Sequence, residues 1–168
     1  MLSVVSLLSL VLVGCSCNLL DSLKQKAADK VIEKVTGGSV SISGSDISVS
    51  GSDGSLSVND KNAQELNNYV QIPGWMTFGN DQTAWKTDSN GTISYTVSYS
   101  SSKSVNDAEQ YWKNFLDTNG YTNVSDYSYS GGATVNGSKD ESAQSLYITV
   151  SSDSSNKVTV IVIYSREK

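Results

Sequence analysis

Apolar and polar residues alternate with a period of two along much of the chain after position 84, which is the pattern of half-buried β-strands. We expect strands near residues 84–87, 92–100, 121–129, 145–151 and 157–164. The pair Asn90-Gly91, between the first two strands, is a strong hairpin signal. The last strand is apolar on both faces, so we expect it at the centre of the sheet.

Between the second and third of these strands, apolar residues recur at steps of three and four instead. Ser104 is a candidate N-cap, with Asp107 as its partner in a capping box. The apolar positions after it share one face of a helix: Ala108, Tyr111, Trp112, Phe115 and Leu116. Asn119-Gly120 ends this helix. We therefore expect residues 62–168 to form an α+β domain, in which an antiparallel sheet of about five strands carries one amphipathic helix on a face.

The segment 15–37 predicts a second helix, at the N-terminal end. Its apolar residues lie on one side of a helix: Leu20, Leu23, Ala27, Val31 and Val35. Lysines alternate with acidic residues on the other side, and Gly37-Gly38 ends the pattern. Such a helix either lies on a membrane surface or packs on the sheet. Because its charges are nearly balanced, we favour packing or a loose tether.

The segment 38–61 contains an internal repeat that predicts a short β-meander. Its three units are Val40-Ser-Ile42, Ile47-Ser-Val49 and Leu56-Ser-Val58, separated by turn-forming Gly, Ser and Asp residues. The apolar residues share one face and the serines the other. The domain's last strand, apolar on both faces, requires a cover on the side away from the helix. We expect either the N-terminal helix or this meander to provide it.

Aspartates recur every seven residues in the repeat, at Asp46, Asp53 and Asp60. A calcium site needs several acidic ligands clustered in one loop, and no Glu closes these loops. We interpret the three aspartates as turn residues and expect no metal site.

The 168-residue chain is acidic, with a net charge of -5 and no histidine. It lacks the basic stripe of a nucleic-acid-binding protein. Without histidine there is no Ser-His or Cys-His pair and no imidazole ligand for zinc. The neighbouring acids Asp107 and Glu109 are explained by the helix dipole, and Asp140-Glu141 by a solvated loop, rather than by glycoside hydrolysis. We therefore expect neither catalytic residues nor a cofactor.

The first fourteen residues carry no charge and are mostly Leu, Val and Ser. This run is shorter than the roughly 20 residues that span a bilayer and has the form of a secretory signal, although no Lys or Arg precedes it. It closes on Leu12-Val13-Gly14-Cys15, which resembles the bacterial lipobox. The resemblance implies cleavage before Cys15, diacylglycerol on its thiol, and a protein anchored at the extracytoplasmic face of a membrane. Cys17 fits the pattern less well, because Gly14 takes the place of the leucine.

Two features after the anchor extend this resemblance. The segment Ile72-Pro73-Gly74-Trp75 follows the Ser/Gly/Asp-rich stretch, and the main helix ends in Leu116-Asp-Thr-Asn-Gly120-Tyr121. In both respects the mature part resembles small extracytoplasmic lipoproteins that carry a Ser/Gly/Asp-rich stretch before an α+β domain. The resemblance implies a location and a fold but no activity.

Candidate ligand contacts are the aromatic residues outside the helix stripe, namely Trp75, Trp85, Tyr127 and Tyr129. The competing interpretation, which we favour, is that these rings cover the core or the sheet edge. Our leading hypothesis is a non-enzymatic surface lipoprotein whose domain binds a protein or another envelope component. A carbohydrate- or cell-wall-binding module that uses these rings, and a passive envelope spacer, are the alternatives.

Overall fold

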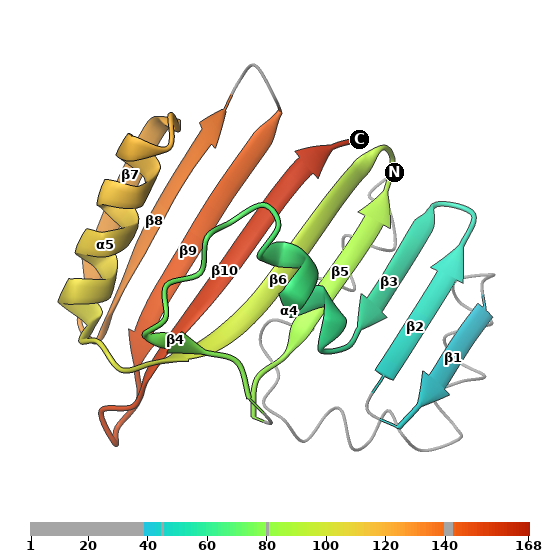
Figure 1. Ribbon diagram of the computed structural model, residues 1–168, viewed down its shortest axis with the longest axis horizontal. Helices are drawn as coiled ribbons and strands as arrows, with labels where there is room; N and C mark the ends of the chain where they lie inside the picture. Colours follow the sequence, from blue (N-terminus) through green and yellow to red (C-terminus); the bar gives the residue numbers. More distant parts are fainter. Residues whose placement is uncertain (1–38, 45, 80, 140–142) are drawn as a thin grey trace.

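The computed structural model describes residues 39–44, 46–79, 81–139 and 143–168, in which the strands form one antiparallel sheet (Figure 1). The predicted signal, Cys15, Cys17 and the predicted helix of segment 15–37 lie outside the described residues. The strands are β1 (Ser39–Ser43), β2 (Asp46–Gly51), β3 (Gly54–Val58), β4 (Met76–Thr77), β5 (Ala84–Ser89), β6 (Thr92–Ser101), β7 (Thr122–Tyr129), β8 (Gly132–Lys139), β9 (Gln144–Ser152) and β10 (Val158–Glu167).

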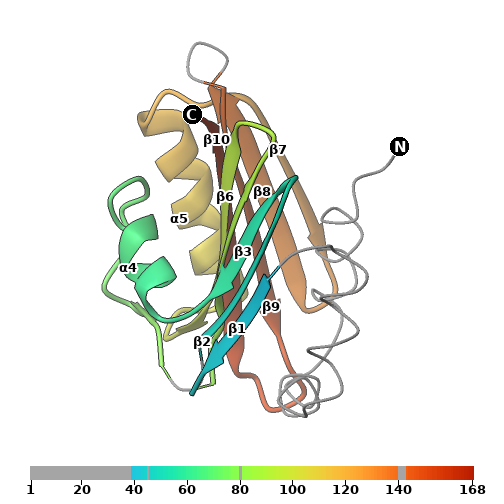
Figure 2. The same ribbon diagram turned by 90° about the vertical axis from the view of Figure 1, so that its right-hand side faces the viewer.

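The spatial order of the strands is β1-β2-β3-β5-β6-β10-β9-β8-β7, and the short β4 pairs with β6 beside this path. The two helices, α4 (Lys61–Leu66) and α5 (Val105–Thr118), lie on the same side of the sheet, as the edge-on view shows (Figure 2). We call this side the inner face and the opposite side the outer face. Helix α5 packs over β7, β8 and β9, while α4 packs over β5 and β6.

The core lies between the inner face and the helices, because alternate residues of the long strands point to that side. Nine inward residues of three central strands are at most 3% exposed: Tyr95, Val97 and Tyr99 of β6, Leu146, Ile148 and Val150 of β9, and Val160, Val162 and Tyr164 of β10. Trp112 and Leu116 of α5 and Leu66 of α4 are fully buried against them. Each such side chain stabilises the fold by about 1.5–3 kcal/mol relative to an exposed one.

Helix α5 begins and ends as its sequence predicts. The Ser104 hydroxyl accepts a hydrogen bond from the Asp107 amide at 3.2 Å and donates one to the Asp107 carboxylate at 2.8 Å. At the other end Gly120 has a φ of 73°, and the Tyr121 amide donates to the Leu116 carbonyl at 3.1 Å. The Tyr121 ring folds back and is only 7% exposed. The predicted N-cap and the predicted end at Asn119-Gly120 are both confirmed.

The predicted class of an antiparallel sheet with an amphipathic helix on one face is confirmed, but the count of about five strands for residues 62–168 is too low. The structure has seven strands there, and the three strands of the meander bring the described sheet to ten. The two strands that were not predicted are β4 and β8. Strand β8 was missed because its inward positions are small residues, Ala133, Val135 and Gly137, which give a weak apolar pattern. Helix α4 was missed because its six residues make less than two turns. The central position of β10 is confirmed, since β6 and β9 pair with its two edges.

The serine-rich meander is present, but it does not cover a face of the sheet. Strands β1, β2 and β3 pair in sequence, and β3 pairs with β5, so the repeat extends the same sheet sideways. Gly54 permits this junction: its φ is 146°, and a Cβ there would overlap the backbone oxygen of Asp88. The expectation that the meander covers the second face is therefore wrong, which leaves the N-terminal helix as the other cover that the sequence suggests.

One buried hydroxyl in the core offers a test of the packing. Among the described residues the Tyr99 hydroxyl has no hydrogen-bond partner, and burial raises the pKa of Tyr99 to about 12. An unsatisfied buried polar group costs about 1–3 kcal/mol. Tyr99→Phe should therefore raise the free energy of unfolding, measured by urea denaturation, by about 1 kcal/mol. As a control, Tyr95→Phe removes a hydroxyl that donates to Glu65 at 3.0 Å, and this variant should have a lower free energy of unfolding than the wild type. A loss of stability in Tyr99→Phe would contradict this packing.

Candidate functional site

The outer face of the sheet is the first candidate, because its side chains fall into rows that cross the whole sheet. Residues directly paired in register point to the same side. One row runs from β1 to β7 through Ile42, Ile47, Val58, Trp85, Thr96, Ile163, Tyr147, Asn136 and Ser125. The row thus joins residues that are far apart in the sequence.

The rows on either side have the same uncharged character. One contains Val40, Val49, Leu56, Thr87, Ser94, Ser165, Ser145 and Ser138. The other contains Ser98, Ile161, Thr149, Thr134 and Tyr127. No position in these three rows is charged. Charged residues of the same strands, such as Lys86, Asp126 and Arg166, alternate with these positions and lie on the inner face.

The outer face divides into two halves of different chemistry. The apolar half consists of the outward residues of β1, β2, β3 and β5, namely Val40, Ile42, Ile47, Val49, Leu56, Val58 and Trp85. The tyrosine half consists of the outward residues of β7, β8 and β9, namely Tyr127, Tyr129, Thr134, Asn136, Tyr147 and Thr149. Between the halves, β6 and β10 present mainly Ser and Thr, together with Ile161 and Ile163.

The tyrosine half presents three accessible rings. Tyr127 is 68% exposed, Tyr129 43% and Tyr147 40%. The rings of Tyr127 and Tyr129 stack with their centroids 6.1 Å apart and their planes at 25°. The Tyr129 ring lies over Gly132 on the neighbouring strand, where any Cβ would clash with it. From the strand spacing and the rise per residue, Tyr147 lies about 12 Å from Tyr127, so the rings could contact successive units of one extended ligand.

The four aromatic residues that the sequence suggested do not form one site. Tyr127 and Tyr129 belong to the tyrosine half. Trp85 is on the same face but in the apolar half, five strands from β7, or about 24 Å. Trp75 belongs to the helix side, where its ring meets Tyr111 of α5 edge-on at 5.3 Å. Tyr127 and Tyr129 are exposed residues of the edge strand β7, so they lie at the sheet edge and not in the core.

Sequence reasoning missed Tyr147, although a signal for it was present. Tyr147 alternates with Leu146, Ile148 and Val150 in a predicted strand, and those three residues are fully buried. The two-residue period therefore assigned Tyr147 to the opposite face. Only the register places it beside Asn136 and Ile163.

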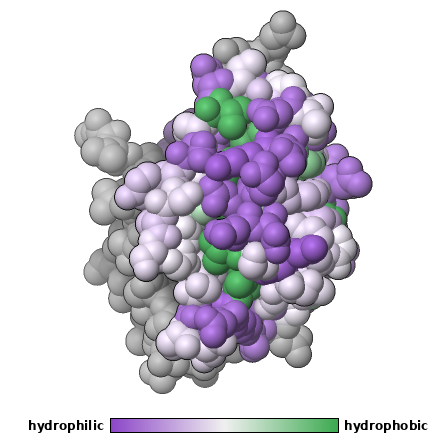
Figure 3. All heavy atoms as spheres, turned by 90° about the vertical axis from the view of Figure 1, so that its left-hand side faces the viewer, coloured by the Kyte–Doolittle hydropathy of each residue, from purple (hydrophilic) through white to green (hydrophobic). Residues whose placement is uncertain are grey.

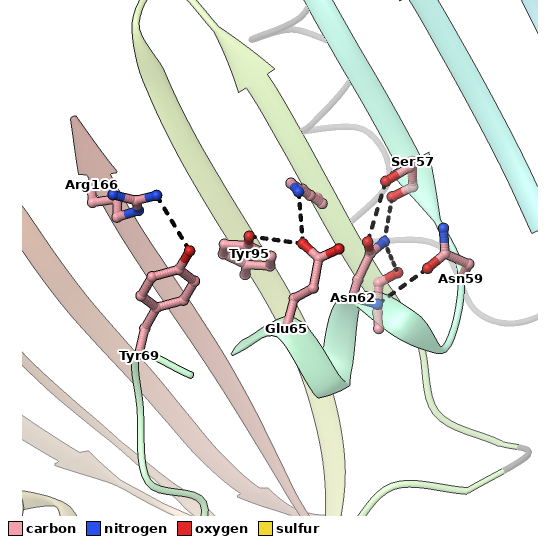
Figure 4. Close-up of polar contacts among 9 residues, drawn as sticks. Ser57, Asn59, Asn62, Glu65, Tyr69, Tyr95 and Arg166 are labelled. Carbon is pink, nitrogen blue, oxygen red and sulfur yellow. Dashed lines mark hydrogen bonds and ion pairs between the residues drawn. The ribbon is translucent and has the colours of Figure 1, made fainter. Parts of the chain in front are cut away.

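Apart from the outer face, the second candidate is a polar cluster that connects α4 to the sheet on the inner face (Figure 4). The buried Asn62 side chain donates from Nδ2 to the carbonyls of Ser57 and Ala84, at 3.0 and 3.1 Å, and accepts from the Ser57 hydroxyl at 3.3 Å. One turn later, the Glu65 carboxylate meets Lys86 of β5 at 2.7 Å and accepts from the Tyr95 hydroxyl. These contacts fix a helix that is too short to be stable alone.

The charges of this cluster are those of a contact that attaches α4 to the sheet, not those of a reactive centre. The hydrogen bond from Lys86 lowers the pKa of Glu65, and the same bond raises the pKa of Lys86, so both groups remain charged at neutral pH. Tyr69 stacks on Tyr164 at 5.4 Å, and the Arg166 guanidinium lies 4.8 Å above the Tyr69 ring. Arg166 also donates to the Tyr69 hydroxyl at 3.3 Å. Within the cluster Glu65 has no carboxylate partner with which to form an acid–base pair.

The third candidate is another polar cluster, which contains Glu109, one of the acids at the start of α5. Its carboxylate lies 2.8 Å from Lys113 and accepts from the Ser128 hydroxyl at 2.8 Å, while Asp126 of β7 meets the same lysine at 2.6 Å. The hydrogen bond from Lys113 is the main reason why the pKa of Glu109 is lowered. A general acid needs a raised pKa instead. This end of the molecule, seen from the α5 and β7 side, is largely hydrophilic with small hydrophobic areas (Figure 3).

The described part of the chain contains no group of three or more His, Cys, Asp and Glu residues arranged to hold a metal ion. Within the same residues, no helix has the length and apolar character needed to cross a membrane. The chain matches no model of a protein family, no curated protein and no solved structure.

The Glu109 cluster predicts a pH dependence of stability. Because the pKa of Glu109 is lower in the folded than in the unfolded protein, its ionisation stabilises the fold above the unfolded pKa of about 4.5, and this contribution disappears as the pH falls through the folded pKa. Glu109→Gln should lower the free energy of unfolding at pH 7 by about 1 kcal/mol and should cost less as the pH falls below 4.5, for example at pH 3. The control Asp117→Asn, on the exposed side of α5, should leave the free energy of unfolding at pH 7 unchanged. An equal loss for Glu109→Gln at both pH values would refute this account.

Proposed function

We propose that this protein is a non-catalytic binding protein, held at the outer side of a prokaryotic membrane by lipid on Cys15, and that its tyrosine half contacts a neutral, hydroxyl-rich polymer of the cell envelope. The observation that carries the proposal is the combination of three accessible tyrosine rings with Thr and Asn side chains on an uncharged part of the sheet face.

The chemistry of the tyrosine half matches that of a neutral glycan. Tyrosine rings stack against the C–H faces of sugar rings, and their hydroxyls form hydrogen bonds with sugar hydroxyls. Thr134, Thr149 and Asn136 add short polar groups between the rings. Tyrosine has few rotatable bonds, so fixing it against a ligand costs little conformational entropy. The residues of the tyrosine half carry no charge, so this surface offers no ionic partner to an acidic or basic ligand.

The anchor part of the proposal rests on the residues before position 16. The segment Leu12-Val13-Gly14-Cys15 resembles a lipobox, which would make Cys15 the first residue of the mature chain. Each methylene group of an acyl chain buried in the bilayer contributes about 0.8 kcal/mol, so two chains on one thioether hold a protein firmly. Such an anchor keeps the sheet close to the envelope polymers that surround the membrane.

A protein partner is the second candidate, and the position of β7 favours it. Strand β7 is the last in the sheet, and no other described strand pairs with its outer edge. An extended segment of another protein can add to such an edge through main-chain hydrogen bonds. The irregularity between Thr122 and Ser125 limits regular pairing to the part of β7 that carries Tyr127 and Tyr129.

Binding to immobilised neutral polysaccharides tests the leading proposal. Tyr127→Ala and Tyr147→Ala should each weaken retention about tenfold, the size expected for one lost stacking contact. Tyr69→Ala is the matched control, because Tyr69 is 40% exposed, like Tyr147, but lies among the contacts of α4 on the inner face. Its retention should equal that of the wild type. Loss of binding in Trp85→Ala, but not in the two outer-face tyrosine variants, would refute the assignment of the tyrosine half.

Metabolic labelling with a fatty-acid analogue tests the anchor. The wild type should incorporate the label and fractionate with membranes, whereas Cys15→Ser should do neither. Cys17→Ser is the matched control and should be labelled like the wild type. Label that persists in Cys15→Ser would show that Cys15 is not the lipidated residue.

A further inference from the structure

The apolar half of the outer face lies on the side of the sheet opposite to the two helices. Both α4 and α5 pack on the inner face, and neither lies on the outer side of β1, β2 and β3 (Figure 2). Ile42, in the same patch, is 36% exposed. This apolar surface is therefore separate from the core described above.

The apolar residues of the meander point to the opposite side of the sheet from those of the long strands. In β6, β9 and β10 the large apolar side chains point inward and Ser and Thr point mainly outward. In β1 and β2 the inward positions are mainly serines, such as Ser41 and Ser48, and every Val and Ile points outward. Strands of five or six residues need a packed apolar face to be stable. For β1–β3 that face is on the outer side alone, so these strands need a cover there.

We propose that residues 19–35 of the same chain form a helix that packs on the apolar half. The residues Leu20, Leu23, Ala27, Val31 and Val35 would provide its apolar stripe. The segment ends just before β1, which begins at Ser39 on the edge of the apolar half. Thr36-Gly37-Gly38 joins the two, and glycines permit the sharp reversal that returns a helix over the strand that follows it.

The dimensions of the helix and the patch agree. A helix of seventeen residues is about 25 Å long. The apolar row crosses from Ile42 in β1 to Ile163 in β10, five strand spacings or about 24 Å. The helix can therefore cover the apolar half from edge to centre and leave the tyrosine half open.

The charges of the segment favour the sheet over a membrane surface. Lys24, Lys26, Lys30 and Lys34 are offset by Asp21, Asp29 and Glu33, so the helix lacks the strong positive charge that draws amphipathic helices to anionic lipid. The apolar half has no charges of its own to conflict with them. This inference depends on the apolar half alone, and it holds whether or not Cys15 carries lipid or the tyrosine half binds a glycan.

Thiol labelling tests the proposal in the chain from position 15 to the C-terminus, with Cys15→Ser and Cys17→Ser. In this background Val49→Cys places one thiol beneath the proposed helix, and its maleimide labelling should be slow. Adding Val31→Asp, within the stripe, should speed labelling about tenfold or more by opening the contact. Lys26→Asp, on the other side of the helix, is the matched control and should leave the rate unchanged. Thr149→Cys, in the tyrosine half, should react rapidly in every background.

Equal labelling of Val49→Cys with and without Val31→Asp would overturn the proposal. Protection that disappears on dilution, together with a dimer in sedimentation, would show that a second copy covers the face and would overturn it as well. Protection that requires phospholipid vesicles would assign the face to the membrane instead.

A cross-linking experiment does not depend on the Val31→Asp variant remaining folded. A short bifunctional maleimide should join Val31→Cys to Val49→Cys within the monomer, and should join Lys26→Cys to Val49→Cys far less. Equal yields for both pairs would contradict the proposed helix face.

Discussion

The pairing of β3 with β5 is the interaction on which the rest of the structure depends. It joins the serine-rich repeat to the long strands, and its register places Val58 opposite Trp85 and Leu56 opposite Thr87. A shift of one residue would move every outward Val, Ile and Leu of the meander to the inner face. The register is fixed at one end by Gly54, which approaches the backbone of Asp88 closely, and by a hydrogen bond from the Ser89 hydroxyl to the Asp53 carbonyl at 2.8 Å. At the other end the Asn62 side chain bridges the carbonyls of Ser57 and Ala84.

This arrangement gives one sheet two separate apolar surfaces. The inner surface is covered by α4 and α5 and forms the core, whereas the residues of the apolar half of the outer face, Trp85 among them, are not part of that core cluster. Between the apolar half and β7 the outer face changes to Ser, Thr, Asn and exposed Tyr. The proposed ligand-binding surface and the proposed helix-binding surface can therefore share one face without competing, since they lie on different strands.

Short sequence patterns predicted the elements that are specified by residues close together in the chain. The Asn90-Gly91 hairpin, the capped helix α5 and the doubly apolar strand β10 each carry their signal within about ten residues. Strand β8 carries no such signal, because one of its inward positions is a glycine, Gly137, instead of a large apolar residue. A side chain at Gly137 would crowd Tyr121, because a Cβ added there would lie 3.1 Å from the Tyr121 Cβ. Helix α4 depends on the contacts of Asn62 and Glu65 with distant strands, which no short window contains.

The candidate site shows the same division between local and distant information. Alternation predicted which residues of the meander share a side. Whether that side is the inner or the outer face follows from the β3–β5 register. Tyr127 and Tyr129 were identified from the sequence, whereas their grouping with Tyr147 required the order β9-β8-β7. Trp75 and Trp85 looked equivalent in the sequence and lie on opposite faces, because Trp75 belongs to the segment that returns over the helix side.

Amide hydrogen exchange of β3 in the full chain, followed by NMR, tests the central pairing most directly. If β3 is a strand of the same sheet, its amides are protected from exchange to the same order as those of β5 and β6. Exchange of the β3 amides at the rate of an unstructured chain, while β6 remains protected, would contradict the register and, with it, both surfaces of the outer face.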